Sequence, residues 1–432
     1  MPATSRRRPF QPEDNYLLKR VLDPQISPDG ARVAYVVQRN DREVNERQTS
    51  IFVARMDGKQ KPRRFTFGKK DHSPRWSPDG RYLAFVADRG DKNQIYLAPL
   101  DGGEARQLTK QPHGAGDPAW SPDAKHVAFV ARTGDYKEPK ERDATEKTAP
   151  RVIHDLRYRF DGIGYFDERR MHVFVAEVES RDAKQITHGD WHDAQPSWSP
   201  DGKTIVFSSD RERARFDRGW SDAWSVSAFG GRARKLTRSR GAANFPSFSP
   251  DGRWIAFAGH EHGEAGSAKN THIMVVPSSG GAAPRSVSAP LDQTLGGGPT
   301  ARPFTWSSDS KSIIFLAQER GTMPLYRASV SGKRVERVVG GDRQIQQFAV
   351  SSDGAHVAFA AAWSSVPSEL YVASLDSGTR ERNISHANDA FLDTASLATT
   401  KRMTSKAPDG LSIESLVLYP PDYKLGRRYP AV

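Results

Sequence analysis

The 432-residue sequence contains no cysteine, no long apolar run and no secretory leader, and each absence excludes a class of protein. Without cysteine there is no disulfide, thiolate metal site or cysteine nucleophile. No apolar stretch approaches the roughly 18 residues that a membrane-spanning helix needs. The basic residues within 1–16 are not followed by an apolar segment, so we expect no signal peptide. Together these absences predict a cytoplasmic protein with no membrane partner.

The formal net charge of +12 raises the alternative of a nucleic-acid-binding protein, because a basic surface attracts phosphate. The lysines and arginines are, however, scattered through predicted turns and strand ends and do not gather on one helix. No zinc-finger, RNA-recognition or helix-turn-helix pattern is present. We therefore expect a basic surface without a nucleic-acid partner.

What the chain does contain is a pattern of eleven residues, WSPDGRYLAFV at 76–86, that recurs along its length. Aligned on its serine, the pattern occurs seven times, with spacings of 50, 44, 78, 50, 58 and 44 residues. The serines are Ser27, Ser77, Ser121, Ser199, Ser249, Ser307 and Ser351. Spacings of this size indicate repeated supersecondary units.

Each repeat predicts a small antiparallel sheet. Ser-Pro-Asp-Gly is typical of a type I turn, and the residues after it alternate as in a strand. A second strand such as 94–103 and a short outer strand such as 105–109 then follow. Seven four-stranded meanders can bury their faces in a radial stack, so the fold class is all-β, a seven-bladed β-propeller with TolB-like blades. Aromatic residues before the turns suit packing between blades; they are Trp76, Trp120, Trp198, Phe248 and Trp306.

The segments around the repeats give the expected domain boundaries. Residues 1–24 form an N-terminal arm with a short helix, and 25–395 form the propeller, with an insertion in the third blade at about 132–170. Within the insertion, 134–150 is charged and aperiodic, which predicts an exposed excursion, whereas 151–170 predicts an ordered loop or hairpin. No spare strand precedes the first repeat. We therefore expect packing alone to hold the ring, with the first and last blades free to part.

The last segment departs from the repeat. Residues 404–432 predict two strands joined by a turn at Asp409-Gly410, and RRYPAV at 427–432 is typical of the start of a third strand. The sequence thus ends inside an apolar strand. We interpret 396–432 as the incomplete opening of a second domain.

Three segments carry a resemblance to a known family. They are the opening PEDNYLLKRVLDPQISPDGARVAYVV, the blade-three stretch RYRFDGIGYFDERRMHVFV and the exit APDGLSIESLVLYPPDYKLGRRYPAV. They are similar to the N-terminal part of prolyl oligopeptidase family serine peptidases, on the acylaminoacyl-peptidase and dipeptidyl-peptidase-like branch. The Ser-Pro-Asp-Gly repeats are less specific, because TolB-like propellers share them.

The resemblance implies that an α/β-hydrolase domain follows, with a His-Gly-Gly-Pro oxyanion segment and a Gly-x-Ser-x-Gly nucleophile elbow. Neither motif occurs in this sequence, so we expect no catalytic residue, no cofactor and no peptide hydrolysis by the chain alone. The propeller would cap the active site, exclude folded proteins and admit short peptides. Its expected partners are the hydrolase domain and those peptides, and a homo-oligomer is left open. The alternative is a stand-alone TolB-like propeller that serves as a protein-binding module.

Two sets of polar residues are candidate sites. In the blade-three stretch, Arg157, Arg159 and Tyr165 could contact a substrate carboxylate or carbonyl, or pack against the hydrolase domain, and we favour the interface. The connections into the inner strands predict a polar ring at one mouth of the central channel. Its members are Asp71, Asp117, Asp193 and Asn244.

Two histidine-containing loops raise the alternative of a metal site. The segment HGDWHDAQPSW at 188–198 has two histidines and two aspartates, residue types that bind zinc, and 259–266 contains His260 and His262. The first is equivalent to connections in other repeats, and the second is a glycine-rich loop. We therefore interpret both as structural and expect no bound metal.

Overall fold

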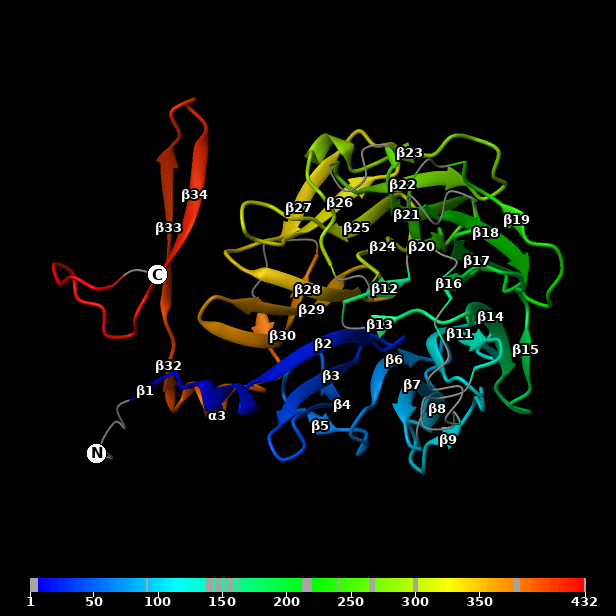
Figure 1. Cartoon of the computed structure of the whole chain (residues 1–432), viewed down its shortest axis with the longest axis horizontal. Helices are drawn as coiled ribbons and strands as arrows, with labels where there is room; N and C mark the ends of the chain where they lie inside the picture. The colour runs from blue at the N-terminus through cyan, green and yellow to red at the C-terminus, as the bar shows by residue number, and fades with distance from the viewer. Residues whose placement is uncertain are drawn as a thin grey trace. The chain divides into compact units, whose positions relative to one another are not determined.

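The computed structural model describes residues 7–430 except 91, 137–142, 144–149, 151, 154–157, 162–163, 212–219, 239–240, 264–268, 298–301 and 376–380. Nearly all of its regular structure is β-strand, arranged as seven four-stranded antiparallel sheets (Figure 1). The expected seven-bladed β-propeller is thereby confirmed. No helix in the described part of the chain is long and apolar enough to cross a membrane.

Every blade runs from an inner to an outer strand. Blades one and two contain β2 Lys19–Ile26, β3 Arg32–Asp41, β4 Glu46–Arg55, β5 Arg63–Arg64, β6 His72–Trp76, β7 Tyr82–Asp88, β8 Asn93–Pro99 and β9 Arg106–Gln107. Blades three and four contain β10 Ala115–Trp120, β11 His126–Thr133, β14 Arg170–Glu177, β15 Ala183–Gln185, β16 Asp193–Trp198, β17 Thr204–Ser209, β18 Asp222–Ser227 and β19 Arg234–Lys235. Blades five to seven contain β20 Ala243–Phe248, β21 Trp254–Gly259, β22 His272–Pro277, β23 Arg285–Ser286, β24 Phe304–Trp306, β25 Ser312–Leu316, β26 Leu325–Ser329, β27 Val335–Val339, β28 Gln344–Val350, β29 His356–Trp363, β30 Val366–Ser374 and β31 Arg382–Asn383.

The chain divides into two compact units by its internal contacts. One comprises residues 1–70, 318–325 and 337–432 and holds blades one and seven with both terminal segments; the other, 71–317 and 326–336, holds blades two to five and most of blade six. Within each unit, the hydrophobic clusters lie between neighbouring blades. The core is therefore made by sheet packing on sheet.

The second strand of each blade is buried on both faces. In β17, the consecutive residues Ile205, Val206 and Phe207 are all buried, the first and third against blade three and the second against blade five. A sheet covered on one side would bury alternate residues only, so neighbouring blades must cover both faces. Cross-strand aromatic pairs fill the centre of five blades, with ring centroids 5.4–6.0 Å apart. The pairs are Tyr35–Phe52, Phe85–Tyr96, Phe129–Phe174, Phe315–Tyr326 and Phe359–Tyr371.

The Ser-Pro-Asp-Gly turn has one hydrogen-bonding scheme in all seven blades. In the fifth blade, Ser249 Oγ donates to Asp251 Oδ1 at 2.6 Å, and the Trp254 backbone N–H donates to Ser249 Oγ at 3.0 Å. The Gly252 N–H donates to the Ser249 carbonyl, and Gly252 has φ +72, which a glycine adopts without strain. The type I turn expected from the sequence is thus confirmed, and the serine hydroxyl ties its two ends together.

The aspartates of all seven turns have pKa values below the ordinary value of 3.8. In five turns the hydrogen bond from the serine is the largest cause, followed by the backbone N–H two residues on; these are Asp29, Asp201, Asp251, Asp309 and Asp353. For Asp79 and Asp123, burial has the largest single effect and raises the pKa, but hydrogen bonds and neighbouring basic side chains together lower it overall.

We expect thermal stability to fall as the pH is lowered from about 4 to about 2. A carboxylate with a depressed folded-state pKa stabilises the fold above its unfolded pKa and loses that contribution as the pH falls through the folded value, which for Asp251 is about 2. An Asp251→Asn variant has one such group fewer. Its melting temperature, followed by circular dichroism, should decline less steeply over this range than that of the parent chain. Equal slopes would show that the turn does not contribute to acid sensitivity.

The aromatic residues before the turns link neighbouring blades, as the sequence predicted. The indole N–H of Trp120 donates to the Arg75 carbonyl at 3.0 Å, and that of Trp198 donates to the Ala119 carbonyl at 2.9 Å. In blade six, Trp306 repeats the contact with Ser247 at 3.3 Å. Each indole thus adds a directed hydrogen bond to the packing of one blade on the next.

The N-terminal arm is shorter than expected. A 3-10 helix, η1 Pro12–Tyr16, forms where a short helix was predicted, but β2 already begins at Lys19 as the inner strand of blade one. The stretch from Lys19 to Leu22 is therefore strand, because it pairs with β3. The first blade begins before the expected boundary at residue 25.

The ring is closed without an exchanged strand, but the expectation of packing alone is wrong. Blades one and seven each use four consecutive strands. Asn388 joins them: its Oδ1 accepts from the Lys19 N–H at 2.9 Å, and its Nδ2 donates to the Lys19 carbonyl at 3.1 Å. Ser368 Oγ also donates to the Val21 carbonyl at 2.9 Å. Side-chain hydrogen bonds to the backbone of β2 thus supplement the hydrophobic contact.

After blade seven come helix α3 Asp389–Leu392 and strand β32 Ala395–Ser396, which pairs in parallel with β1 Arg8–Pro9. The predicted pair of strands then follows as the hairpin β33 Thr399–Lys406 and β34 Ser412–Tyr419. Its turn lies at Asp409-Gly410, as expected, with the Gly410 N–H donating to the Ala407 carbonyl. The expected third strand is absent from residues 427–430, where no neighbouring strand pairs with them.

Candidate functional site

The long connection in blade three is located at the end of the sheet where the chain enters the blade. The first residue of β10, Ala115, lies opposite Ala131 near the end of β11, and the insertion starts directly after β11. Its described part includes the hairpin β12 Arg159–Phe160 and β13 Gly164–Tyr165, as the sequence predicted for this stretch. The insertion therefore projects from the end of the blade opposite its Ser-Pro-Asp-Gly turn.

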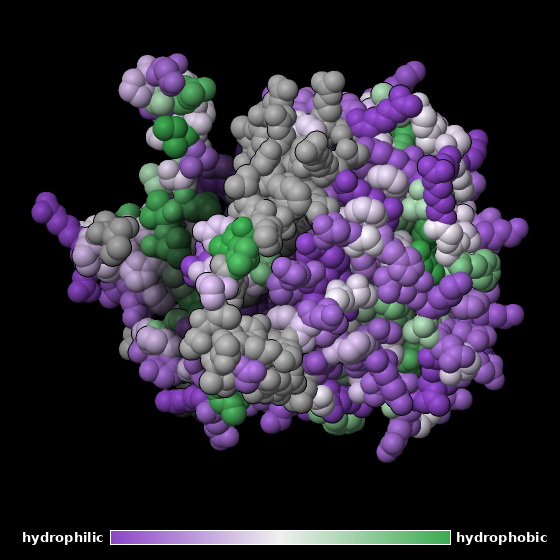
Figure 2. All heavy atoms as spheres, turned by 45° about the vertical axis from the view of Figure 1, so that its right-hand side comes forward, coloured by the Kyte–Doolittle hydropathy of each residue, from purple (hydrophilic) through white to green (hydrophobic). Residues whose placement is uncertain are grey.

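The hairpin carries an exposed aromatic cluster. Tyr158 and Tyr165 stack with ring centroids 6.1 Å apart, and the Arg159 guanidinium lies 5.5 Å from the centre of the Tyr165 ring. Tyr158, Phe160, Tyr165 and Phe166 are 44, 62, 49 and 43% exposed. On the face shown in Figure 2, by comparison, hydrophilic side chains predominate. The hairpin brings Arg159 and Tyr165 together, while Arg157 lies outside the described residues.

The base of the insertion is tied to blade three by an ion-pair cluster. Arg169 donates to both carboxylate oxygens of Asp167 at 2.6 and 3.0 Å, and Arg132 of β11 lies 3.6 Å from the same carboxylate. The Arg169 guanidinium also covers the Tyr136 ring at 3.7 Å. Burial raises the pKa of Asp167, but the hydrogen bonds and the charge of Arg169 lower it overall. This base gives the exposed hairpin a defined point of attachment.

The inner strands of blades one to five contain a bulge before a proline. The strand register shifts there, and the residue before the proline has a left-handed φ of 46–59°. Proline cannot donate to the ladder, which explains why pairing is interrupted at this point. The bulge residues are Asp23, Ser73, Asp117, Gln195 and Phe245.

The four residues predicted to form a polar ring occupy three different positions around this bulge. Asp71 and Asp193 come two residues before it and are fully buried. Asn244 comes one residue before it and is half-buried, whereas Asp117 is the bulge residue itself and is exposed. Only Asp117 and Asn244 therefore present accessible surface. Whether they border a channel mouth stays a prediction.

Sequence reasoning missed Arg302, whose guanidinium interacts with the charge of Asp117. Arg302 precedes Pro303 and so corresponds to the bulge residues of the other blades. It has exposed surface, yet burial lowers the pKa of its guanidinium, while Asp117 raises it and Arg75 lowers it. An alignment of the residues that precede the inner-strand prolines could have identified Arg302.

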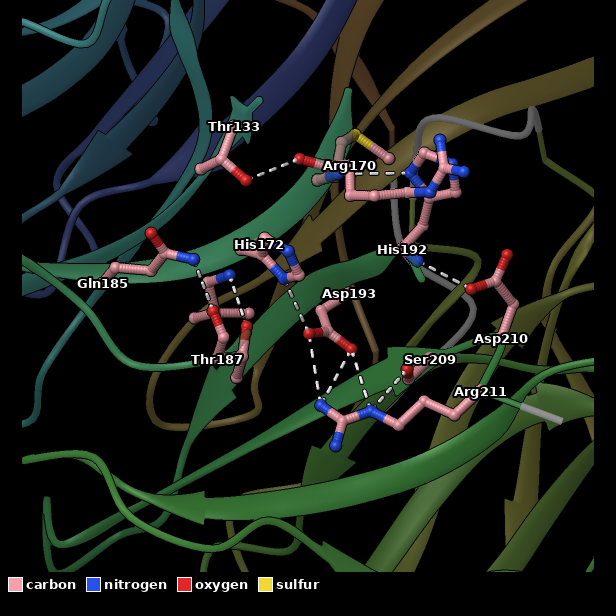
Figure 3. A network of polar contacts seen from close by, with 12 residues as sticks. Thr133, Arg170, His172, Gln185, Thr187, His192, Asp193, Ser209, Asp210 and Arg211 are labelled. Atoms are coloured by element: carbon pink, nitrogen blue, oxygen red, sulfur yellow. Dashed lines mark hydrogen bonds and ion pairs between the residues drawn. The ribbon is translucent and has the colours of Figure 1, made fainter. Parts of the chain in front are cut away.

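Asp193 is the centre of a buried polar network (Figure 3). Arg211 donates through Nη2 to both carboxylate oxygens at 3.1 and 3.2 Å and through Nε at 3.3 Å, and His172 Nδ1 lies 3.2 Å from Oδ2. The Arg211 guanidinium also lies 4.8 Å from the centre of the Trp191 ring and 4.7 Å from that of Trp224. The network joins β14 of blade three to β16 of blade four and to the segment after β17. Its geometry fixes structure and offers no exposed reactive atom.

Two other polar side chains of the 188–198 segment form hydrogen bonds outside the Asp193 network. His192 Nδ1 accepts from the Met171 N–H at 3.2 Å, and Asp190 accepts from Arg170 Nε at 2.8 Å. In the other loop, the rings of His260 and His262 are stacked with centroids 6.4 Å apart. Among the residues that the structure describes, no three histidine or acidic side chains are grouped to hold a metal ion.

Comparisons with known proteins agree with this architecture. A model of the acylaminoacyl-peptidase N-terminal β-propeller domain matches residues 140–364, and a TolB β-propeller (PD40) model matches 17–148. The uncharacterized peptidase YuxL of Bacillus subtilis is 29% identical over 97% of this chain and 65% of its own length. Dipeptidyl-peptidase 5 of Porphyromonas gingivalis is 26% identical over 98% of this chain and 62% of its own. The chain thus spans less than two thirds of the length of these relatives.

A solved structure shows the same fold. The acylaminoacyl peptidase of Pyrococcus horikoshii superimposes with a TM-score of 0.75 and 17% identity, over 98% of this chain and 61% of that chain. The similarity therefore extends over the seven blades and the segments that flank them.

Proposed function

Because the chain belongs to the family of acylaminoacyl-peptidase N-terminal β-propeller domains, we propose that it is the propeller part of a serine peptidase that acts on short peptides. In this proposal the chain carries no catalytic group. It caps the active site of an α/β-hydrolase domain, keeps folded proteins out and limits the entry of water. The family match carries the proposal.

The exposed apolar side chains of the terminal hairpin support the proposal that a hydrolase domain packs against it. Met403 and Ile413 lie on one face of the β33–β34 hairpin and Leu416 and Leu418 on the other, and these four side chains are 48–62% exposed. Strands covered on both faces are typical of the central sheet of an α/β domain. We propose that further strands and helices of the hydrolase domain cover this hairpin.

The blade-three hairpin is the proposed contact surface of the propeller with that domain. Its exposed aromatic rings and Arg159 have the composition of an interface centre, in which aromatic residues and arginine are enriched. The ion-pair cluster around Asp167 holds its base. We favour this contact over a direct role of Arg159 in binding a substrate carboxylate.

The first experiment compares this chain with the protein encoded by the reading frame extended beyond residue 432. We expect the chain alone not to hydrolyse N-acetylalanyl or dipeptidyl p-nitroanilides. The extended protein should hydrolyse one of them and leave a folded protein substrate intact. Hydrolysis by the chain alone, or equal cleavage of folded protein and peptide, would contradict the proposal. A reading frame without a hydrolase would leave the alternative, a protein-binding TolB-like propeller, which the match at 17–148 supports.

A matched pair of variants of the extended protein tests the contact surface. Tyr165→Ser should change the peptidase rate several-fold, since it removes an aromatic ring from the proposed interface. Phe229→Ser is the control, because Phe229 is 69% exposed but follows β18 at the Ser-Pro-Asp-Gly end of its blade. Equal behaviour of the two variants would argue against an interface at the blade-three hairpin.

A further inference from the structure

An open pocket of about 550 Å³ lies between the outer strand of blade six and blade seven. It is lined by Arg337, Val338, Gly340, Gly341, Arg343, Trp363 and Glu381. All of these residues belong to one compact unit of the chain. The pocket has two guanidinium groups and one carboxylate, hence a net positive charge, and an indole ring contributes an apolar wall.

Arg343 is held rigidly at this pocket. Its side chain is 4% exposed, and its guanidinium lies 4.9 Å from the centre of the Phe359 ring and 5.1 Å from that of Trp363. The two terminal nitrogens donate to the two carboxylate oxygens of Glu381, Nη1 at 2.6 Å. This end-on pairing orients the arginine and leaves its other edge, at Nε, for a second partner.

The Nε–H of Arg343 has no acceptor in the described part of the chain, although the atom is buried. A buried donor without an acceptor is costly, so its persistence calls for an explanation. Gly341 is the nearest wall: a Cβ on this residue, whose φ is +104, would lie 3.5 Å from Nε. Gly340 leaves similar room beside Arg337, where a Cβ would approach Cδ and Nε to 3.2 Å. A side chain at Gly340 would therefore crowd Arg337, whereas one at Gly341 would make an ordinary contact with Arg343 but strain the backbone.

We propose that this pocket binds a small organic carboxylate. Because Nε of Arg343 is buried, binding would require the Gly340-Gly341 backbone to move enough to uncover it, which two glycines allow. The flat carboxylate would then accept from Nε–H of Arg343 and from Arg337, and its apolar body would lie against Trp363. Glu381 already neutralises one charge, so the pocket suits a monoanion better than a phosphate dianion. Arg337 can turn to the ligand at low cost, because its pair with Glu319, at 3.3 Å, is a surface pair. The proposal is independent of the peptidase function.

Fluorine NMR of the chain labelled with 5-fluorotryptophan tests the proposal, with Trp363→Phe assigning the resonance of Trp363. We expect benzoate to shift that resonance with a Kd of about 1–10 mM. Benzamide, which has the same shape without the charge, and inorganic phosphate should bind at least about tenfold more weakly. No shift with benzoate at ten times the expected Kd, or equal affinity for benzoate and benzamide, would overturn the proposal.

Two variants locate the site. Arg337→Gln should weaken benzoate binding about tenfold, whereas Arg334→Gln, just before the same strand but outside the pocket, should leave it unchanged. Arg343→Lys keeps the charge but removes the Nε–H and should abolish the shift of the Trp363 resonance. If this buried variant does not fold, the comparison of Arg337→Gln with Arg334→Gln still tests the location of the site. Equal benzoate affinity of these two variants would refute the assignment.

Discussion

Replacing Asp193 with alanine should lower the free energy of unfolding by about 3–5 kcal/mol. The carboxylate is fully buried and neutralises the guanidinium of Arg211, whose side chain is only 13% exposed. Without it, Arg211 and His172 lose their shared acceptor in a place that is almost closed to water. Removing one partner of a buried pair costs more than the pair contributes, because the other charge stays buried.

Asp190→Ala is the matched control for this prediction, since Asp190 lies on the same connection and is also paired with an arginine. Its side chain is 75% exposed, and its contact with Arg170 is a surface ion pair. We expect it to cost about 0–1 kcal/mol. Urea unfolding of both variants, followed by tryptophan fluorescence, provides the measurement. Similar midpoints would show that burial does not set the energy of the Asp193 network.

The turns were predictable because their interactions are local. Ser249, Asp251 and Gly252 make their bonds within a few residues of one another, so the sequence contains the whole scheme. The repeat of the pattern then determined the number of blades. The packing role of Trp120 and Trp198 followed from the same alignment, since both stand directly before the serine of the turn.

The polar sites were less predictable because they depend on which face of a strand meets which neighbour. Asp193 and Asp117 look alike in sequence, yet one is buried against Arg211, eighteen residues later, and the other is an exposed bulge residue. A one-residue bulge changes the direction of every side chain before it. The Gly340-Gly341 pocket depends on Arg343 reaching across to Glu381, and no short-range pattern indicates that contact.

Ring closure should depend on one buried carboxylate, that of Glu369, which is 1% exposed. It accepts from the backbone N–H groups of Ala387 and Asn388 at 2.8 and 2.7 Å, from Asn388 Nδ2 at 2.9 Å and from Ser385 Oγ. These bonds hold the Asn388 amide against the backbone of Lys19. Glu369→Ala would leave several buried donors without an acceptor, and we expect it to cost about 3–5 kcal/mol.

Glu46→Ala is the control, because Glu46 is 59% exposed, 4.0 Å from Lys70, and should contribute at most about 1 kcal/mol. Hydrogen exchange distinguishes a loss of the Asn388 link between blades one and seven from a general loss of stability. If Asn388 holds the two blades together, the 17–26 segment of Glu369→Ala should exchange faster than blade three under native conditions, because local opening then precedes global unfolding. A uniform increase would show that Glu369 stabilises blade seven without joining it to blade one. In that case hydrophobic packing between the two blades would suffice, as the absence of an exchanged strand first suggested.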